Sequence, residues 1–94
     1  MGRKTHNPSL TRKIARDLKQ GQSPEALLSV VDSITDSYYS SLSYFHLASS
    51  GFKEAKQTNN AFNLGFKNLR KVSQTWRRIE LLGKITNILK KVSE

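Results

Sequence analysis

The chain has 94 residues, which is enough for one domain with a thin hydrophobic core and too few for two independent cores. It contains no cysteine and two histidines, which excludes a disulfide framework and argues against a zinc cluster. Lys and Arg number 16 against 7 Asp and Glu, so the formal net charge is +9 and an anionic partner is favoured.

Targeting signals are not evident in the sequence. No apolar run reaches the roughly 18 to 20 residues of a membrane span, and no charged-then-apolar signal segment opens the chain. We therefore expect a soluble protein without a transmembrane segment, located in the cytoplasm or, in a eukaryote, in the nucleus. Residues 1–8 are predicted to form a flexible basic arm, and residues 9–94 a single helical-bundle domain.

The first predicted helix begins at Asn7-Pro8, where Asn7 is a typical N-cap and proline suits the first helical position. Leu10, Ile14 and Leu18 then recur every four residues and form one narrow apolar stripe. Basic side chains occupy the opposite face. Gly21 is predicted to end this helix.

The second predicted helix begins at Ser23-Pro24 and runs to about Ser49. Its apolar residues keep a spacing of three or four along this whole length, which predicts one long core-facing stripe. These residues are Leu27, Val31, Ile34, Tyr38, Leu42 and Phe45. Ser33, Ser37 and Ser40 lie on another face, which we interpret as solvated; the alternative is a face whose small side chains let another helix approach closely.

The third predicted helix follows the turn at Ser49-Ser50-Gly51 and starts near Lys53. Its apolar series predicts a buried face that includes the tryptophan. The series is Phe62, Phe66, Leu69, Val72, Trp76 and Ile79. Beyond Leu81 the apolar face is rotated by roughly 150°, so one straight helix cannot bury both halves on one side.

We predict that this last helix breaks or kinks near Gly83, the alternative being a continuous helix covered on its second side by the first helix. The expected fold is therefore all-α: a small bundle of three helices, the last long and kinked or split near Gly83 into a fourth.

The positive charge is confined to the two ends of the chain. Residues 1–20 carry six basic side chains and one acid, residues 21–50 three acids and no Lys or Arg, and residues 51–94 ten basic side chains and three acids. Four late basic residues recur every seven positions, and three more flank them. A continuous helix would therefore hold them in one row. The predicted binding residues are Arg12, Lys13, Arg16, Lys19, Lys67, Arg70, Lys71, Arg77, Arg78, Lys84 and Lys91.

We interpret these residues as one basic surface that contacts phosphates. The predicted function is a small non-catalytic module that binds RNA or DNA mainly through its backbone, as a regulatory or accessory factor. About five neutralised phosphates would give a slope of log K against log salt of roughly −4 to −5. The alternative is a protein-interaction module, such as an adaptor, inhibitor or immunity-type bundle, that docks an acidic partner. The rotated apolar strip could also complete its core in a homodimer.

Catalytic chemistry is not expected. His46 has serines within helical reach, at positions 43, 49 and 50, but no carboxylate lies three or four residues away to orient its ring. Asp32 and Asp36 lie one turn apart without the loop ligands that calcium needs. We therefore predict no enzyme activity, no metal site and no cofactor.

Two stretches resemble parts of known motifs. Residues 14–31, with Gly21 and Ser23-Pro24 between apolar pairs, are similar to the first half of a helix-turn-helix of the recombinase or transposase kind. That family continues with a tight turn and a recognition helix. Here residues 32–35 contain no glycine, and the helical spacing of the apolar residues continues without a break to Phe45. Residues 38–62, with Gly51-Phe52 at the turn, resemble a tetratricopeptide hairpin in which serines replace the usual small residues. We assign the chain to neither family.

Overall fold

The computed structural model describes residues 7–93, and the side chains of residues 9–91 within that range. The described residues form five α-helices and no strand, which confirms the all-α class. The helices are α1 (Asn7–Lys19), α2 (Pro24–Asp32), α3 (Ser37–Ser50), α4 (Ala55–Lys71) and α5 (Thr75–Ser93). The predicted count of three or four helices is wrong, because both later predicted helices are divided.

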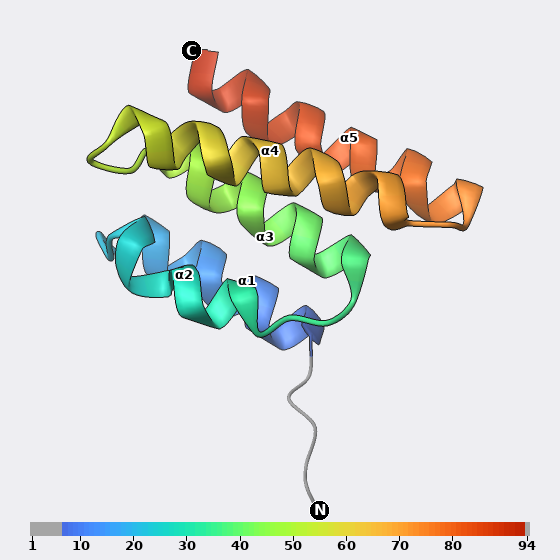
Figure 1. Ribbon diagram of the computed structural model, residues 1–94, viewed down its shortest axis with the longest axis horizontal. Helices are drawn as coiled ribbons and strands as arrows, with labels where there is room; N and C mark the ends of the chain where they lie inside the picture. Colours follow the sequence, from blue (N-terminus) through green and yellow to red (C-terminus); the bar gives the residue numbers. More distant parts are fainter. Residues whose placement is uncertain (1–6, 94) are drawn as a thin grey trace, which may run out of the picture.

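The third helix is the centre of the molecule. In Figure 1, α1 and α2 lie on one side of α3, and α4 and α5 lie on the other. The most extensive helix pairing is that of α3 with α4, and α1, α2 and α5 all pack against α3 as well. The radius of gyration is 12.7 Å, close to the roughly 13 Å expected for a folded chain of about 100 residues.

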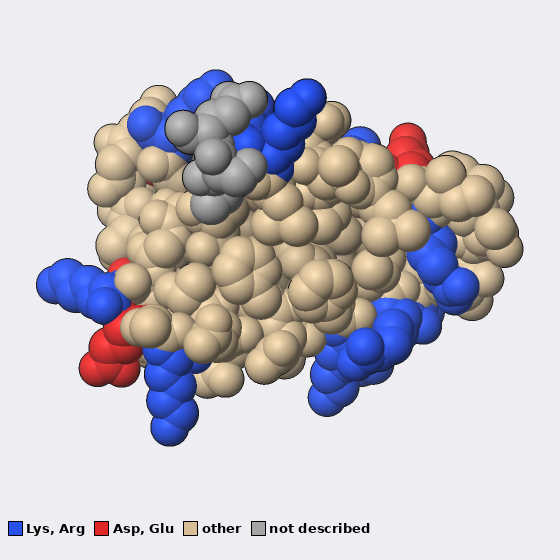
Figure 2. Space-filling view, turned by 90° about the horizontal axis from the view of Figure 1, so that it is seen from above, with Lys and Arg blue, Asp and Glu red and all other residues tan. Residues whose placement is uncertain are grey.

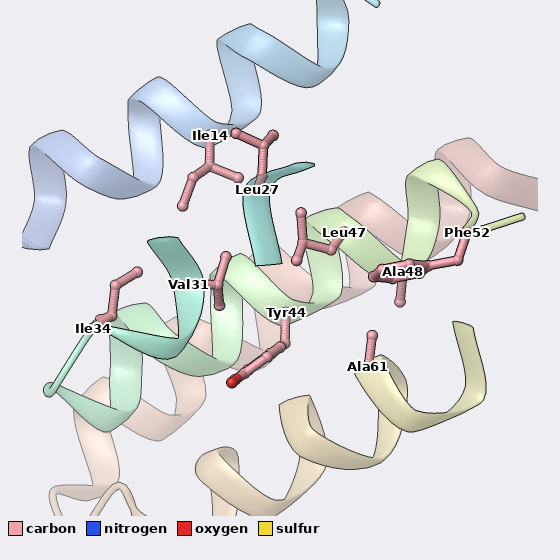
Figure 3. Close-up of a cluster of buried hydrophobic side chains, with 9 residues drawn as sticks. All are labelled: Ile14, Leu27, Val31, Ile34, Tyr44, Leu47, Ala48, Phe52 and Ala61. Atoms are coloured by element: carbon pink, nitrogen blue, oxygen red, sulfur yellow. The ribbon is translucent and has the colours of Figure 1, made fainter. Parts of the chain in front are cut away.

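The first hydrophobic cluster lies between α1, α2 and α3 (Figure 3). Ile14 of α1 and Val31 of α2 point toward Leu47 of α3, and all three side chains are buried. Phe52 and Ala61 extend this cluster toward α4. The narrow apolar stripe predicted for the first helix therefore faces the core, since Ile14 is buried and Leu10 and Leu18 pack against the same cluster.

The second hydrophobic cluster joins α3 to α4 and α5. Phe45 of α3 has no exposed surface, and Leu69 of α4 and Leu81 and Ile85 of α5 are buried with it. Phe62 of α4 packs against both clusters, so the two are continuous through α3. Because α3 contributes to both, it is buried around most of its circumference.

Polar side chains of α3 are buried between helices and make hydrogen bonds there. The Ser41 hydroxyl donates to the Gly65 carbonyl oxygen of α4 at 2.7 Å. The Ser43 hydroxyl shares a hydrogen bond of 3.0 Å with the Thr11 hydroxyl of α1. Gly65 is required for the close approach of α4, since a Cβ at this position would lie 2.7 Å from the ring of buried Phe45.

The serine face predicted to be solvated does not exist as one face. Ser40 is buried, Ser37 is half-buried and Ser33 is exposed in the link between α2 and α3. The alternative interpretation is correct for α3, because small side chains let neighbouring helices approach closely. The serines that face these helices are mainly Ser41 and Ser43, whose hydroxyls make the hydrogen bonds to α4 and α1.

The predicted helix boundaries that rest on local chemistry are confirmed. Ser23 caps α2 by accepting a hydrogen bond from the Ala26 amide, and Pro24 is the first helical residue. Gly21 after α1 and Gly51 after α3 have positive φ angles of 99° and 87°, which glycine adopts without strain. The predicted helix start at Asn7 is confirmed, whereas the cap role of its side chain lies outside the described side chains.

The predicted helix from Pro24 to about Ser49 is wrong, because the chain leaves the helix after Asp32 and resumes it at Ser37. The Ser33 hydroxyl donates to the Val30 carbonyl oxygen at 2.6 Å and competes with the helical pattern. Asp36 then adopts an extended conformation as the N-cap residue of α3.

The predicted break near Gly83 is also wrong, because Gly83 lies inside α5 and the chain turns earlier, at residues 72–74. Val72 is extended and buried in the second cluster. The Arg78 guanidinium donates two hydrogen bonds to the Val72 carbonyl oxygen, at 3.1 and 2.6 Å, and holds the turn. Since α4 and α5 are separate helices, each turns its own apolar side toward α3.

Part of the predicted N-terminal arm is helical, since residues 7 and 8 belong to α1. The remainder of the arm, residues 1–6, lies outside the described residues.

Candidate functional site

An open groove of about 760 Å³ lies where α1 and the C-terminal half of α5 meet the last turns of α3. It brings together residues from both ends of the chain. The lining residues are Arg12, Ala15, Arg16, Leu18, Lys19, His46, Ser49, Ser50, Asn87, Ile88 and Lys91. Four of them are basic and none is acidic, so the electrostatic potential of the groove is positive.

One wall of the groove is the exposed side of α1. Arg12, Arg16 and Lys19 are spaced by four and three residues and therefore share one face of the helix. The opposite side of α1 is fixed to the core by buried Ile14 and by the hydrogen bond between Thr11 and Ser43. All three cations are exposed, and Arg16 and Lys19 also complement the negative C-terminal end of the α1 dipole.

The other wall is α5, which contributes Asn87, Ile88 and exposed Lys91. The floor combines half-buried Leu18 with the end of α3. His46 is half-buried there, and its pKa is lowered below its usual value, first by burial and then by the positive charge of Lys91. The floor is therefore partly apolar, and the basic side chains stand around it.

The arrangement suits an anionic ligand with an uncharged body. Arginine forms paired hydrogen bonds with phosphate or carboxylate oxygens, and lysine supplies a mobile point charge. No Phe, Tyr or Trp lines the groove, so it offers no large aromatic surface for base stacking.

The hydroxyls of Ser43 and Ser49 make hydrogen bonds away from the His46 imidazole. Ser43 is bound to Thr11, and the Ser49 hydroxyl donates to the His46 carbonyl oxygen at 2.9 Å rather than meeting the imidazole. Among the side chains that the structure describes, no group of three or more His, Cys, Asp and Glu is placed to hold a metal ion. In the same part of the chain, no helix is long and apolar enough to cross a membrane.

Two of the predicted binding residues on the C-terminal segment are engaged with α3. The Arg77 guanidinium forms an ion pair of 2.8 Å with Asp36 and lies 4.8 Å above the centre of the Tyr38 ring. Lys84 lies 5.6 Å from the centre of the same ring, and its interaction with Tyr38 raises the pKa of its ammonium group. These two side chains therefore do not line the groove.

The remaining predicted binding residues also lie elsewhere. Lys13 forms an ion pair of 2.9 Å with Asp17, and Arg78 is used to hold the turn before α5. Three exposed cations belong to the last turns of α4, on the other side of α3 from α1 (Figure 1): Lys67, Arg70 and Lys71. The seven-residue row is divided, since Arg70 belongs to α4 and only three of its members share α5.

The structure exposes an apolar surface that the predicted helices do not indicate. Trp76 was predicted to be core but is 65% exposed, and Ile79 is 64% exposed. The signal was present in the phase of the apolar residues: Trp76 and Ile79 lie on the side of α5 opposite Leu81 and Ile85, which are buried. Because the sequence pattern predicts one helix from Lys53 to Gly83, it places Trp76 and Ile79 on the same face as the apolar residues of α4.

The segment that resembles the first half of a helix-turn-helix is followed by a turn at residues 33–36 and then by a helix. That helix is α3, whose side chains Phe45 and Leu47 have no exposed surface, so it cannot enter a groove of DNA. The hairpin expected at residues 38–62 is present as α3 and α4.

Comparison with family models gave no match, and neither did comparison with curated proteins or with solved structures. The function is therefore argued from the side chains themselves.

Proposed function

We propose that this protein is a non-catalytic nucleic-acid-binding module, a regulatory or accessory factor that holds RNA or DNA through phosphate contacts in the groove between α1 and α5. One observation carries the proposal: Arg12, Arg16 and Lys19 from the first helix and Lys91 from the last surround one groove whose lining contains no acid. Basic residues more than seventy positions apart in the sequence therefore contribute to one region of positive electrostatic potential.

The physical reason is counterion release. Each phosphate that a Lys or Arg neutralises frees part of the condensed counterion layer, and this term dominates sequence-independent binding. Arg12 and Lys19 are separated by seven residues, or about 10 Å along the helix, so they reach different phosphates of one strand. Without base-stacking rings or an exposed recognition helix, the groove carries little sequence information.

The size of the salt effect follows from the groove. With about four phosphates contacted, log K should fall with log salt at a slope of about −3 for single strands and slightly steeper for duplex. This is shallower than the slope expected from the sequence, since Arg77, Arg78 and Lys84 are engaged elsewhere.

The test is fluorescence anisotropy of labelled single-stranded RNA and DNA and of duplex DNA, across a salt series. Arg12→Gln combined with Arg16→Gln should weaken binding and flatten the slope by about 1.5, since one phosphate contact contributes roughly 0.7 to 0.9. Lys67→Gln combined with Lys71→Gln removes the same charge from the far side of α3 and serves as the matched control. Equal losses in the two double variants, or binding without salt dependence, would rule out the groove as the site.

A further inference from the structure

A second surface of the molecule is apolar and faces outward. Trp76, Ile79 and Leu82 are 65%, 64% and 44% exposed, and their spacing of three places them on one side of α5. We call this side, together with Gly83, the outer face of α5. Trp76 and Ile79 lie opposite the face that packs on α3, and Leu82 lies at the edge between the two faces. Isolated exposed apolar residues are common on proteins, whereas a contiguous stripe of large ones marks an interaction site.

Gly83 is a second observation on the same face. It lies in the interior of α5, has no positive φ angle, and a Cβ built on it meets no atom within 4 Å. The fold itself therefore gives no reason for a glycine here, although glycine weakens a helix interior. Its absent side chain leaves the backbone of α5 open beside Ile79 and Leu82, which allows another helix to pack closely.

Basic side chains predominate on α4 and α5, the two helices on this side of the molecule. The last turns of α4, which lead directly into α5, carry exposed Lys67, Arg70 and Lys71, and none of these forms an ion pair within the described part of the chain. Lys90 lies seven residues beyond Gly83 on the same line of the helix. The acid of this helix, Glu80, accepts a hydrogen bond from the Tyr38 hydroxyl at 3.1 Å and is thus directed toward α3.

Figure 2 looks onto the side of the molecule formed by α4 and α5. Its centre is uncharged, Lys and Arg stand around the rim, and acidic residues occupy two small areas of the edge. The exposed apolar stripe of Trp76, Ile79 and Leu82 lies on this side, where basic residues predominate. Such a surface is complementary to a helix that has apolar residues along one side and acids beside them.

We propose that the outer face of α5 docks an acidic amphipathic helix of a partner protein. A second copy of the chain would bring two basic rims together, since each copy has a net charge of +9. A nucleic acid would leave the apolar centre without a matching surface, because phosphates do not pair with Trp76 and Ile79. The partner's acids meet Lys67, Arg70 and Lys71, and its apolar side chains cover Trp76 and the open backbone at Gly83.

The experiment uses the emission of Trp76, which is the sole tryptophan of the chain. The probes are two synthetic helical peptides of about 18 residues with the same leucine heptad, one flanked by Glu and the other by Lys. Titration of the full chain with the Glu-flanked peptide should shift the emission to shorter wavelength and reduce quenching by acrylamide, while the Lys-flanked peptide should cause neither change.

Two variants separate the apolar centre from the rim. We expect both variants to lower the affinity for the Glu-flanked peptide by about tenfold or more, the loss typical of a central interface residue. One is Ile79→Asp, and the other is the triple variant Lys67→Gln, Arg70→Gln, Lys71→Gln. Both sites are exposed, so circular dichroism should be unchanged. Arg12→Gln with Arg16→Gln should leave peptide binding unaltered, which separates this face from the groove.

Three results would overturn the proposal. The first is a shift of equal size with both peptides, which means apolar adhesion without charge recognition. The second is the absence of any shift with the Glu-flanked peptide. The third is an emission that moves with the concentration of the protein alone, which assigns the outer face to a second copy.

Discussion

The helices α3 and α5 contrast in what they bury. The centre of α3 carries serines at positions 40, 41 and 43, and all are buried. α5 carries a tryptophan and an isoleucine that are about two-thirds exposed. Side-chain polarity alone therefore predicts the wrong environment for both helices. The difference shows that small size decides what lies between closely packed helices, since Ser41 and Gly65 meet through a hydrogen bond of 2.7 Å.

Replacing one aromatic residue of each helix by alanine tests this contrast and should give the largest difference in the free energy of unfolding. Phe45→Ala should lower the free energy of unfolding by about 3–5 kcal/mol, because Phe45 has no exposed surface and packs against Phe62 and Phe66. Trp76→Ala should change it by no more than about 0.5 kcal/mol. Urea denaturation of both variants gives the comparison. A cost for Trp76→Ala as large as that for Phe45→Ala would contradict its placement on the surface.

Two glycines in helix interiors provide a second comparison, with effects of opposite sign. Gly65→Ala places a methyl group 2.7 Å from the buried Phe45 ring and should destabilise the protein by about 1–3 kcal/mol. Gly83→Ala meets no atom within 4 Å and should stabilise it by about 0.5–1 kcal/mol. Thermal melting of the two variants and of the unsubstituted protein measures both changes in stability. The same sign for both would show that α4 does not approach α3 as closely as described.

The buried hydroxyl pair between α1 and α3 sharpens the comparison at a smaller scale. Thr11→Val or Ser43→Ala alone leaves one buried hydroxyl without its partner and should cost about 1–2 kcal/mol. The double variant should cost less than the sum of the single variants, because neither hydroxyl is then left unpaired. A double-mutant cycle by urea denaturation measures this coupling energy. Strictly additive costs would show that the hydrogen bond does not join the two helices.

Helix starts and ends could be predicted from the sequence wherever a local interaction determines them. Ser23-Pro24 predicts the start of α2, and Gly21 and Gly51 predict two helix ends, because caps and positive φ angles depend on neighbouring residues alone. The two missed turns have a common cause. Ile34 and Val72 lie outside the helices but are buried, so the apolar period continues through each turn and masks it.

The candidate groove was predictable only in part. Helical spacing places Arg12, Arg16 and Lys19 on one face, but nothing local indicates that Lys91 stands across from them. The positions of Arg77 and Arg78 could not be derived from periodicity either. Arg77 is paired with Asp36, which is distant in the sequence. Arg78 is bound to the backbone carbonyl of Val72, which accepts no hydrogen bond within a helix because α4 ends at Lys71.

The smallest expected effect concerns His46, the half-buried group of α3 that faces α5. Burial and the charge of Lys91 lower its pKa, and the other charged groups of the groove, Arg12, Arg16 and Lys19, are also cations. Below the ordinary value of 6.5 the unfolded chain therefore binds a proton that the folded chain does not. The contribution of His46 to the free energy of unfolding should fall from pH 6.5 down to the lowered pKa and be constant below it.

Titration of the His46 ring by nuclear magnetic resonance measures this pKa directly. Lys91→Gln removes one of the two causes of the shift and should move the pKa partway back toward 6.5, whereas Lys67→Gln, on the far side of α3, should leave it unchanged. A bound phosphate strand should raise the same pKa, so nucleic-acid affinity should increase as the pH falls through it. A pKa at or above 6.5 in the free protein would contradict the position of His46 in the floor of a basic groove, because each charge around it acts against protonation.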